Sequence, residues 1–224
     1  MVKAVIFDMF ETLVSLFDGK TYFSENMAAD LGVSEEAFRK PWHATENDRT
    51  LGKITIEEGI GVALQALGIF SEEKVSFIDG KRLEALTDTF SMIPEESDQL
   101  LIRLHEKGIK TGLISNCFSD EAKFIKESRL FPLFDEVMLS YEQGIGKPDP
   151  EIYRQMIGKL GVRPDECIYV GDGGSRELFT AKELGMKPVQ ALWFREGMFE
   201  PHIPCPVLDD FLHAETQADI EKYL

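Results

Sequence analysis

The side chains best suited to chemistry in this sequence come directly after apolar segments. Asp8 follows the apolar run Val2–Phe7. Ser115 and Asn116 close a second apolar run, and Asp172 follows a third. Near-continuous apolar runs bounded by turn residues are typical of buried parallel strands, and open α/β sheets bind ligands at the carboxyl ends of their strands. We therefore expect these acid, hydroxyl and amide groups to meet at one sheet edge, where a small polar ligand would sit.

Two further charged groups lie in comparable places. Lys147 stands between Gly146 and Pro148, in a rigid loop before a helical pattern. Glu177 comes after Asp172 and two glycines, at the opening of another helical pattern. Each group alone has an ordinary structural explanation, since an acid is favourable in the first turn of a helix and most lysines are surface charges. Their expected convergence at one edge is what predicts a site.

Strand and helix patterns alternate along most of the chain, with Pro openings and Gly endings where helix termini favour them. Strands are expected at Val2–Phe7, Thr111–Ser115, Glu136–Ser140, Cys167–Val170 and Val189–Phe194. Helices are expected at Pro94–Lys107, Asp120–Ser128, Pro150–Leu160 and Ser175–Leu184. This alternation predicts an α/β protein with a Rossmann-like three-layer core, in which a parallel sheet carries helices on both faces.

The stretch from residue 15 to residue 90 contains no convincing strand. Its patterns predict helices at Tyr22–Leu31, Ser34–Asn47, Thr55–Leu67 and Ser71–Phe90. We therefore expect an all-helical cap domain at 15–90, inserted into an α/β core domain formed by 1–14 and 91–224, with a ligand in the crevice between them. The acidic tail Asp209–Leu224 is expected to be a strand end followed by a solvated helix.

Composition excludes several classes of protein. The 224 residues carry 24 Lys+Arg and 40 Asp+Glu, a net charge of −16 that disfavours nucleic acid and anionic membranes because like charges repel. A hydrophobic fraction of 43% excludes disorder, and no apolar stretch approaches the ~18 residues of a spanning helix. Cys117, Cys167 and Cys205 fit neither a disulfide framework nor a zinc site. The first apolar segment is too short for a signal peptide, so we expect a cytoplasmic protein.

Taken in order, the polar segments resemble the four motifs of the haloacid dehalogenase (HAD) superfamily of hydrolases, most of whose members are magnesium-dependent phosphatases. The helical insertion after the first segment matches the helical cap of that family. The segments are Phe7-Asp8-Met9-Phe10-Glu11-Thr12-Leu13, Leu113-Ile114-Ser115-Asn116, Gly146-Lys147-Pro148-Asp149-Pro150 and Tyr169-Val170-Gly171-Asp172-Gly173-Gly174-Ser175-Arg176-Glu177.

The resemblance implies a role for each matching residue in phosphoryl transfer. Asp8 would be the nucleophile that takes the phosphoryl group as an aspartyl phosphate. Ser115, with Asn116 beside it, would bind the phosphoryl oxygens of the substrate. Lys147 would bind there as well and would neutralise both Asp8 and the charge that develops during the reaction.

The resemblance also implies a metal cofactor. Asp8, Asp172 and the backbone carbonyl of Phe10 would hold Mg²⁺, which prefers oxygen ligands and keeps positions open for water and phosphate. Like charges crowded into one cleft would raise the pKa values of these acids unless a cation offsets them. Whether Glu177 also touches the metal is left open.

Phe10 departs from the family pattern. Phosphatases of the family usually carry at this position a second Asp, which protonates the leaving group and activates the hydrolytic water. A phenyl ring cannot transfer a proton, and losing a positioned acid or base typically costs about 10²- to 10⁴-fold in rate. Glu11 is adjacent, but successive side chains of an extended segment point apart, so we do not expect it to substitute.

Three functions stay open on this sequence. The first is a Mg²⁺-dependent phosphatase of low rate that acts on a small phosphorylated metabolite. The second is a metal-independent 2-haloacid dehalogenase-like hydrolase, in which Asp8 attacks carbon. The third is a catalytically weakened ligand-binding or regulatory protein, and in each case a monomer or homodimer is expected. The cap cations Lys20, Arg49 and Lys53 are more typical of a solvated face than of substrate clamps.

Overall fold

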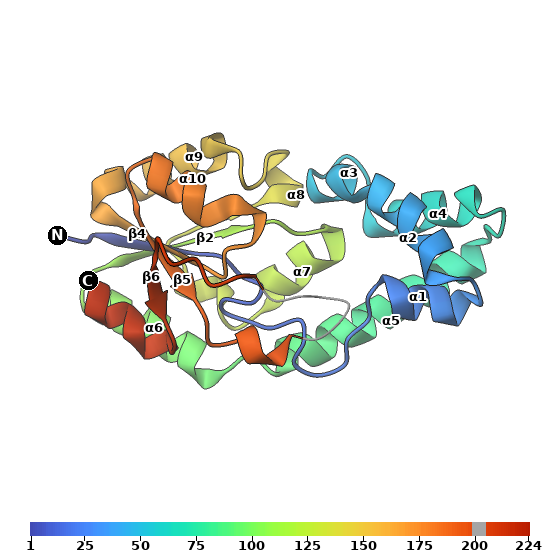
Figure 1. Cartoon of the computed structure of the whole chain (residues 1–224), viewed down its shortest axis with the longest axis horizontal. Helices are drawn as coiled ribbons and strands as arrows, with labels where there is room; N and C mark the ends of the chain where they lie inside the picture. The colour runs from blue at the N-terminus through green and yellow to red at the C-terminus, as the bar shows by residue number, and fades with distance from the viewer. Residues whose placement is uncertain (199–204) are drawn as a thin grey trace.

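A six-stranded parallel sheet forms the centre of the protein in a computed structural model that describes residues 1–198 and 205–224 (Figure 1). The strand order is β3-β2-β1-β4-β5-β6. The strands are β1 (Ala4–Phe7), β2 (Lys110–Ser115), β3 (Glu136–Leu139), β4 (Cys167–Gly171), β5 (Lys187–Ala191) and β6 (Leu212–Ala214). Because β1 lies between β2 and β4, the carboxyl ends of the three strands that precede predicted site residues are neighbours.

Helices cover both faces of the sheet, which confirms the predicted three-layer core (Figure 1). Alternate residues of β1 face opposite sides: Val5 and Phe7 belong to one apolar cluster, Ala4 and Ile6 to the other. The first cluster includes α6 (Glu95–Glu106), α7 (Ser119–Glu127) and the C-terminal 3₁₀ segment η5 (Gln217–Tyr223). The second includes α9 (Pro150–Leu160) and α10 (Glu177–Glu183).

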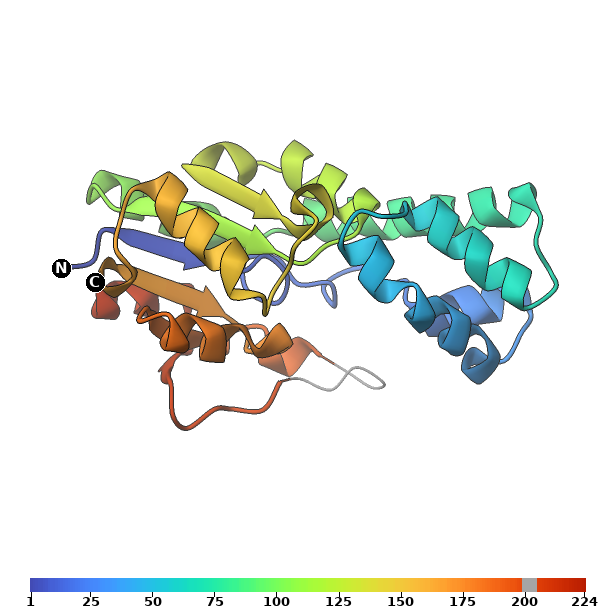
Figure 2. The same cartoon turned by 90° about the horizontal axis from the view of Figure 1, so that it is seen from above.

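Between β1 and β2 the described chain forms helices and no strand. Besides α6 of the core, they are α1 (Ser24–Leu31), α2 (Glu35–Ala44), α3 (Glu46–Thr50), α4 (Ile56–Ala66) and α5 (Glu72–Ser91). They form a lobe at one end of the molecule, and their buried side chains make an apolar cluster of their own (Figures 1 and 2). We call this lobe the cap helices; the exact domain boundaries at 15 and 90 stay a prediction.

Two predicted helices have different bounds in the structure. Ser34–Asn47 is divided into α2 and α3, because Thr45 leaves the helical conformation and its hydroxyl bonds to the Trp42 carbonyl at 3.0 Å. Ser175–Leu184 begins late, as α10 at Glu177, because Ser175 and Arg176 have left-handed φ angles of 49° and 52°. The prediction missed this turn because only tertiary contacts impose such angles on these residue types.

The strand expected at Val189–Phe194 is shifted. β5 begins earlier, at Lys187, and ends at Ala191, where the chain turns because the Leu192 carbonyl accepts the Arg195 N–H at 3.1 Å. The tail forms β6 and then η5, whose Ile220 is fully buried, so this segment packs on the core instead of being a solvated helix.

The remaining short elements are η1 (Phe131–Leu133), α8 (Ser140–Gln143), η2 (Pro164–Glu166), η3 (Gly174–Arg176) and η4 (Arg195–Gly197). Within the described ranges, no helix has both the length and the apolar character to cross a membrane.

Candidate active site

Asp8 and Lys147 form a close ion pair at the carboxyl edge of the sheet. Asp8 continues β1, and its backbone N–H donates to the Val170 carbonyl of β4 at 2.9 Å. Its Oδ1 lies 2.5 Å from Nζ of Lys147, and both residues are 7% exposed. A carboxylate and an ammonium from distant parts of the sequence therefore share one buried position.

The Lys147 loop is held by Asn116 at the end of β2. The Asn116 amide donates to the Lys147 carbonyl at 2.8 Å, and its Oδ1 accepts the Lys147 N–H at 2.8 Å. A Cβ at Gly146 would lie 2.6 Å from Oδ1 of Asn116, so a glycine is needed beside this pair. The structure thus gives Asn116 a loop-holding contact, while its substrate contact stays a prediction.

Glu177 is a second counter-ion for Lys147. Its Oε2 lies 2.6 Å from Nζ of Lys147 and accepts the Tyr169 hydroxyl at 2.9 Å, and Glu177 is fully buried. A Cβ at Gly171 would fall 1.9 Å from Oε1 of Glu177, so this glycine makes room for the carboxylate. Tyr169 is not among the predicted site residues, and its phenol in an otherwise aliphatic strand was the available signal.

Asp172 faces the same position from the end of β4. Its Oδ1 accepts the Gly174 N–H at 2.9 Å, and its Oδ2 accepts the Cys205 thiol at 3.3 Å. Oxygens of Asp8, Asp172 and Glu177 all lie within 4.8 Å of one another. This acidic cluster has the oxygen donors and the negative charge to hold a divalent cation.

Burial dominates the electrostatics of the cluster. It raises the pKa of Asp8 to about 7, although Lys147 acts in the opposite direction. Burial also raises the pKa of Asp172, and the charge of Asp8 adds to the effect. For Lys147, burial favours the neutral amine, but attraction to Asp8 and Glu177 prevails and raises its pKa above the usual lysine range. The ammonium therefore stays charged and limits the repulsion between the acids.

The side chains of Phe10 and Glu11 make their contacts outside the acidic cluster, although Glu11 lines a small cavity together with Asp172. The Phe10 ring packs edge to face on Phe90 of α5, with centroids 6.4 Å apart. Glu11 has a left-handed φ of 56°, and its carboxylate accepts hydrogen bonds from the Ser15 hydroxyl at 2.8 Å and the Leu16 N–H at 2.7 Å. Both oxygens of Glu11 are thus engaged within its own loop.

Ser115 and the cap helices complete the surroundings of the pair. Ser115 is fully buried at the end of β2, and its hydroxyl donates to the Asn116 carbonyl at 3.4 Å. A cavity of about 580 Å³ is lined by Asn116 and Lys147 of the core and by His43 and Glu46 of the cap helices. The crevice predicted between the two parts therefore opens beside Lys147.

Curated relatives of the chain include phosphatases. It is 27% identical over 215 residues to a glyceraldehyde 3-phosphate phosphatase of Methanopyrus kandleri, across 91% of this chain and 88% of the relative. It is 35% identical over 101 residues to the protein of the same name from Pyrococcus furiosus. That match covers 44% of this chain and 40% of the relative's length.

Solved structures and a family model agree on the fold. A 2-haloacid dehalogenase from Pseudomonas syringae pv. Tomato DC3000 superimposes with a TM-score of 0.70 at 21% identity, over 99% of this chain and 97% of that one. The model of the haloacid dehalogenase-like hydrolases matches residues 2–185. Because this match runs through the strands and loops that bring Asp8, Lys147 and Asp172 together, the chain belongs to the family of haloacid dehalogenase-like hydrolases.

Proposed function

We propose that this hydrolase is a phosphatase that acts on a small phosphorylated metabolite through an aspartyl phosphate on Asp8. The observation that carries the proposal is the Asp8 carboxylate, 2.5 Å from the Lys147 ammonium and next to Asp172. Phosphoryl transfer needs a nucleophile and fixed positive charge where negative charge develops. The relative named a glyceraldehyde 3-phosphate phosphatase, which aligns along 91% of the chain, supports the same class of reaction.

In this proposal the reaction has two steps. Asp8 attacks phosphorus, the bond from phosphorus to the ester oxygen breaks, and the leaving alkoxide takes a proton from solvent. Water then attacks the phosphorus of the aspartyl phosphate, which frees inorganic phosphate and restores Asp8. Lys147 neutralises the phosphoryl charge in both steps, and Ser115 hydrogen-bonds a phosphoryl oxygen.

Mg²⁺ is the cofactor of this proposal, held by Asp8, Asp172 and the backbone carbonyl of Phe10. The donor set fits a hard cation, because all of its donors are oxygen atoms. The two carboxylates also repel each other, and a bound cation would offset that repulsion. Among the described residues no backbone N–H donates to the Phe10 carbonyl, so this oxygen is available as a ligand. The neighbouring Met9 carbonyl, by contrast, accepts the Leu13 N–H at 2.8 Å. When bound, the cation neutralises charge on the phosphoryl oxygens.

The cap helices are proposed to form a domain at 15–90 that selects the substrate. His43 and Glu46 of these helices face Lys147 across the cavity of about 580 Å³. Side chains from the cap therefore surround the part of the substrate that leaves with the ester oxygen. Closure of a lid over such a site excludes water and completes the contacts to substrate.

Phosphate release from an activated aryl phosphate tests the proposed function. Activity should require Mg²⁺, and Asp8→Asn should reduce it to background because an amide is a poor nucleophile. Asp48→Asn is the matched control and should keep wild-type activity, because Asp48 is a partly exposed acid of α3 whose side chain pairs with Lys53 at 2.8 Å. Release that persists in the presence of a chelator, or in Asp8→Asn, would contradict the proposal.

Phe10 favours a second candidate, a 2-haloacid dehalogenase-like hydrolase, because halide leaves carbon without protonation. The test is halide release from a 2-haloacid with a chelator present. Halide above background that depends on Asp8 would favour this candidate over the phosphatase.

A further inference from the structure

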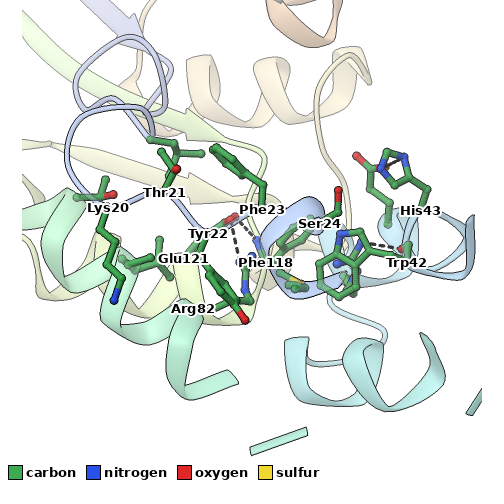
Figure 3. A pocket seen from close by; sticks show the side chains of 17 residues that line it. Lys20, Thr21, Tyr22, Phe23, Ser24, Trp42, His43, Arg82, Phe118 and Glu121 are labelled. Atoms are coloured by element: carbon green, nitrogen blue, oxygen red, sulfur yellow. Dashed lines mark hydrogen bonds and ion pairs between the residues drawn. The ribbon is translucent and has the colours of Figure 1, made fainter. Parts of the chain in front are cut away.

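A cavity of about 330 Å³ lies where the cap helices meet the core, and its size suits a small metabolite (Figure 3). Its walls come from both parts of the chain. Tyr22 and Trp42 belong to the 15–90 segment, and Phe118 belongs to the loop after β2. Figure 3 shows these rings with Arg82 and Glu121 around the cavity. The lining combines aromatic surface with buried charge.

Arg49 of α3 also lines this cavity and is 1% exposed. Its guanidinium carbon lies 3.4 Å from the centroid of the Trp42 ring and 4.4 Å from that of Phe118. Nη2 donates to the Trp42 carbonyl at 2.9 Å. Nε also donates to the Thr45 carbonyl at 3.5 Å. Two aromatic rings and two hydrogen bonds therefore fix the plane of the guanidinium at the boundary between cap and core.

One nitrogen of this guanidinium has no acceptor. Nη1 of Arg49 is buried and makes no hydrogen bond within the described residues. Burial lowers the pKa of Arg49 to about 10, and nearby Arg82 adds to the effect, yet the group stays charged at neutral pH. A buried N–H group without an acceptor is costly, and an anionic ligand that accepts from Nη1 would remove that cost.

Arg82 in the same cavity is, by contrast, fully paired. Its guanidinium contacts Oδ2 of Asp120 at 2.8 Å and Oε1 of Glu121 at 3.3 Å. The charges of Glu46, Glu121 and Asp120 act on Arg49 in the direction that raises its pKa, but among the described residues its guanidinium donates only to backbone carbonyls. Arg49 thus differs from Arg82, whose guanidinium contacts two carboxylates.

The backbone makes room for the Arg49 side chain. A Cβ at Gly59 of α4 would lie 2.4 Å from Cδ of Arg49. Glycine in a helix interior destabilises the helix relative to alanine. The helix thus carries a destabilising residue at the point where it admits this arginine.

The cavity shares lining residues with the cavity beside Lys147. His43 and Glu46 line it and also line the second cavity, whose wall includes Lys147. A small ligand with its phosphoryl group beside Lys147 would extend past these residues toward Arg49.

From these observations we propose that Arg49 binds a carboxylate of the substrate, so the substrates are small phosphate monoesters that also carry a carboxylate. This proposal rests on the proposed phosphatase function and narrows its substrate class. We propose a carboxylate and not a second phosphate because a carboxylate carries one negative charge, which matches the one positive charge that Arg49 offers. Lys20 and Arg82, the other Lys and Arg side chains lining the cavity, already pair with acids, so Arg49 offers a single positive charge.

Binding of phosphonates tests the proposal without turnover. Calorimetric titrations in the presence of Mg²⁺ would compare a series of ω-phosphonocarboxylates of increasing length with their neutral carboxamides. At the length that spans the site, the acid should bind wild type about 10-fold or more tightly than its amide, as expected for one hydrogen bond between charged groups. Acids and amides that bind equally at every length would overturn the proposal, and this comparison needs no variant.

Arg49→Met should remove the preference for the acid, and Lys53→Met is the matched control. Lys53 is an exposed cation near the same helix that pairs with Asp48 at 2.8 Å, so its loss should leave the preference intact. Circular dichroism establishes that both variants are folded. A preference for the acid that survives in folded Arg49→Met would overturn the assignment.

Turnover separates this proposal from the phosphatase function. Arg49→Met should lower the ratio of kcat/KM for a carboxylated phosphate ester to kcat/KM for a neutral aryl phosphate about 10-fold or more. Release of phosphate from both esters with no effect of Arg49 would overturn the Arg49 assignment alone. An Arg49-dependent preference in binding with no phosphate release from any ester would overturn the phosphatase function alone.

Discussion

Lys147 is shared between two carboxylates, and this sharing explains how one ammonium stays charged in a buried site. Asp8 lies 2.5 Å from Nζ and Glu177 lies 2.6 Å from it. Tyr169 fixes the orientation of Glu177 through its hydroxyl at 2.9 Å. We therefore expect Glu177 to act on the proposed reaction through the position of Lys147, as a positioning residue.

Glu177→Gln should lower kcat about 10-fold or more with little change in KM. Lys147 would then keep its ion pair with Asp8 and lose the one with Glu177, so its ammonium would no longer be fixed from two sides. Loss of a hydrogen bond to a charged group also costs about 1.5–3 kcal/mol of stability. Steady-state kinetics and chemical denaturation measure both effects. Tyr169→Phe is the milder control and should move kcat in the same direction; unchanged kcat in Glu177→Gln would contradict the positioning role.

Phe10→Asp should increase the rate of phosphate release from esters with poor leaving groups, by up to ~10²-fold, because it supplies an acid near the ester oxygen. Activated aryl phosphates need little protonation and should gain much less. The variant also loses the edge-to-face contact with Phe90, so its melting temperature should fall. If alkyl and aryl phosphates respond equally, the side chain of residue 10 does not face the leaving group.

Contacts between secondary-structure elements join the cap helices to the core. Arg82 on α5 bonds to Asp120 and Glu121 at the start of α7, and all three are buried. The backbone N–H at the start of α4 adds a bond from Ile56 to the Ser119 hydroxyl at 2.9 Å. These bonds hold the closed arrangement that brings Arg49 onto Phe118.

The buried Glu121 should make stability depend on pH. Burial and the neighbouring Asp120 raise its pKa in the folded state from 4.5 to about 7. The folded protein then binds the proton more tightly than the unfolded chain, so this contribution is present below pH 4.5 and is lost as the pH rises through 7. Relative to Glu121→Gln, the free energy of unfolding of wild type should fall between these pH values. Glu96→Gln, exposed on α6, should follow wild type throughout; parallel curves for Glu121→Gln would contradict the raised pKa.

Two glycines in the cap helices should respond oppositely to alanine. Gly59→Ala places a methyl group against Arg49 and should destabilise the protein by about 1–3 kcal/mol, as overpacking does. Gly80→Ala on α5 meets nothing within 4 Å and should stabilise it by about 0.4–1 kcal/mol. Chemical denaturation measures both changes. Equal effects at the two positions would show that the fit of Arg49 against α4 is not tight.

At the scale of the whole molecule, negative charge is concentrated as well as abundant. The chain carries a net charge of −16, and the acidic cluster adds like charges at close range inside it. Self-repulsion opposes the compact state. Folding therefore assembles a site that a cation should stabilise together with the whole structure.

Mg²⁺ should raise the melting temperature, because a ligand that binds only the folded state adds about 2.7 kcal/mol at a 100-fold excess over its Kd. Asp172→Asn should remove most of this increase. Sodium chloride at the same ionic strength is the control for general screening of the net charge. An equal increase with sodium chloride, or in Asp172→Asn, would contradict a specific cation site.

Much of the fold follows from properties that depend on near neighbours in the chain. Apolar runs and capped helical patterns indicated the strands and helices, because burial periodicity and helix termination are local effects. Parallel strands end at the same edge, so the convergence of Asp8, Ser115 and Asp172 followed from their places after strands.

Pairings between distant side chains required the folded chain. Nothing near Glu177 in the sequence indicates that it shares Lys147 with Asp8, and nothing near Arg49 indicates a buried guanidinium held between two rings. Arg49 was expected on a solvated face of the cap. The helical pattern predicts which side of the helix carries Arg49, but it does not predict which other segment packs against that side. The contact of Glu177 with Lys147 spans 30 positions, and that of Arg49 with Phe118 joins α3 to the loop after β2. The geometry of such contacts is set by packing that no local pattern contains.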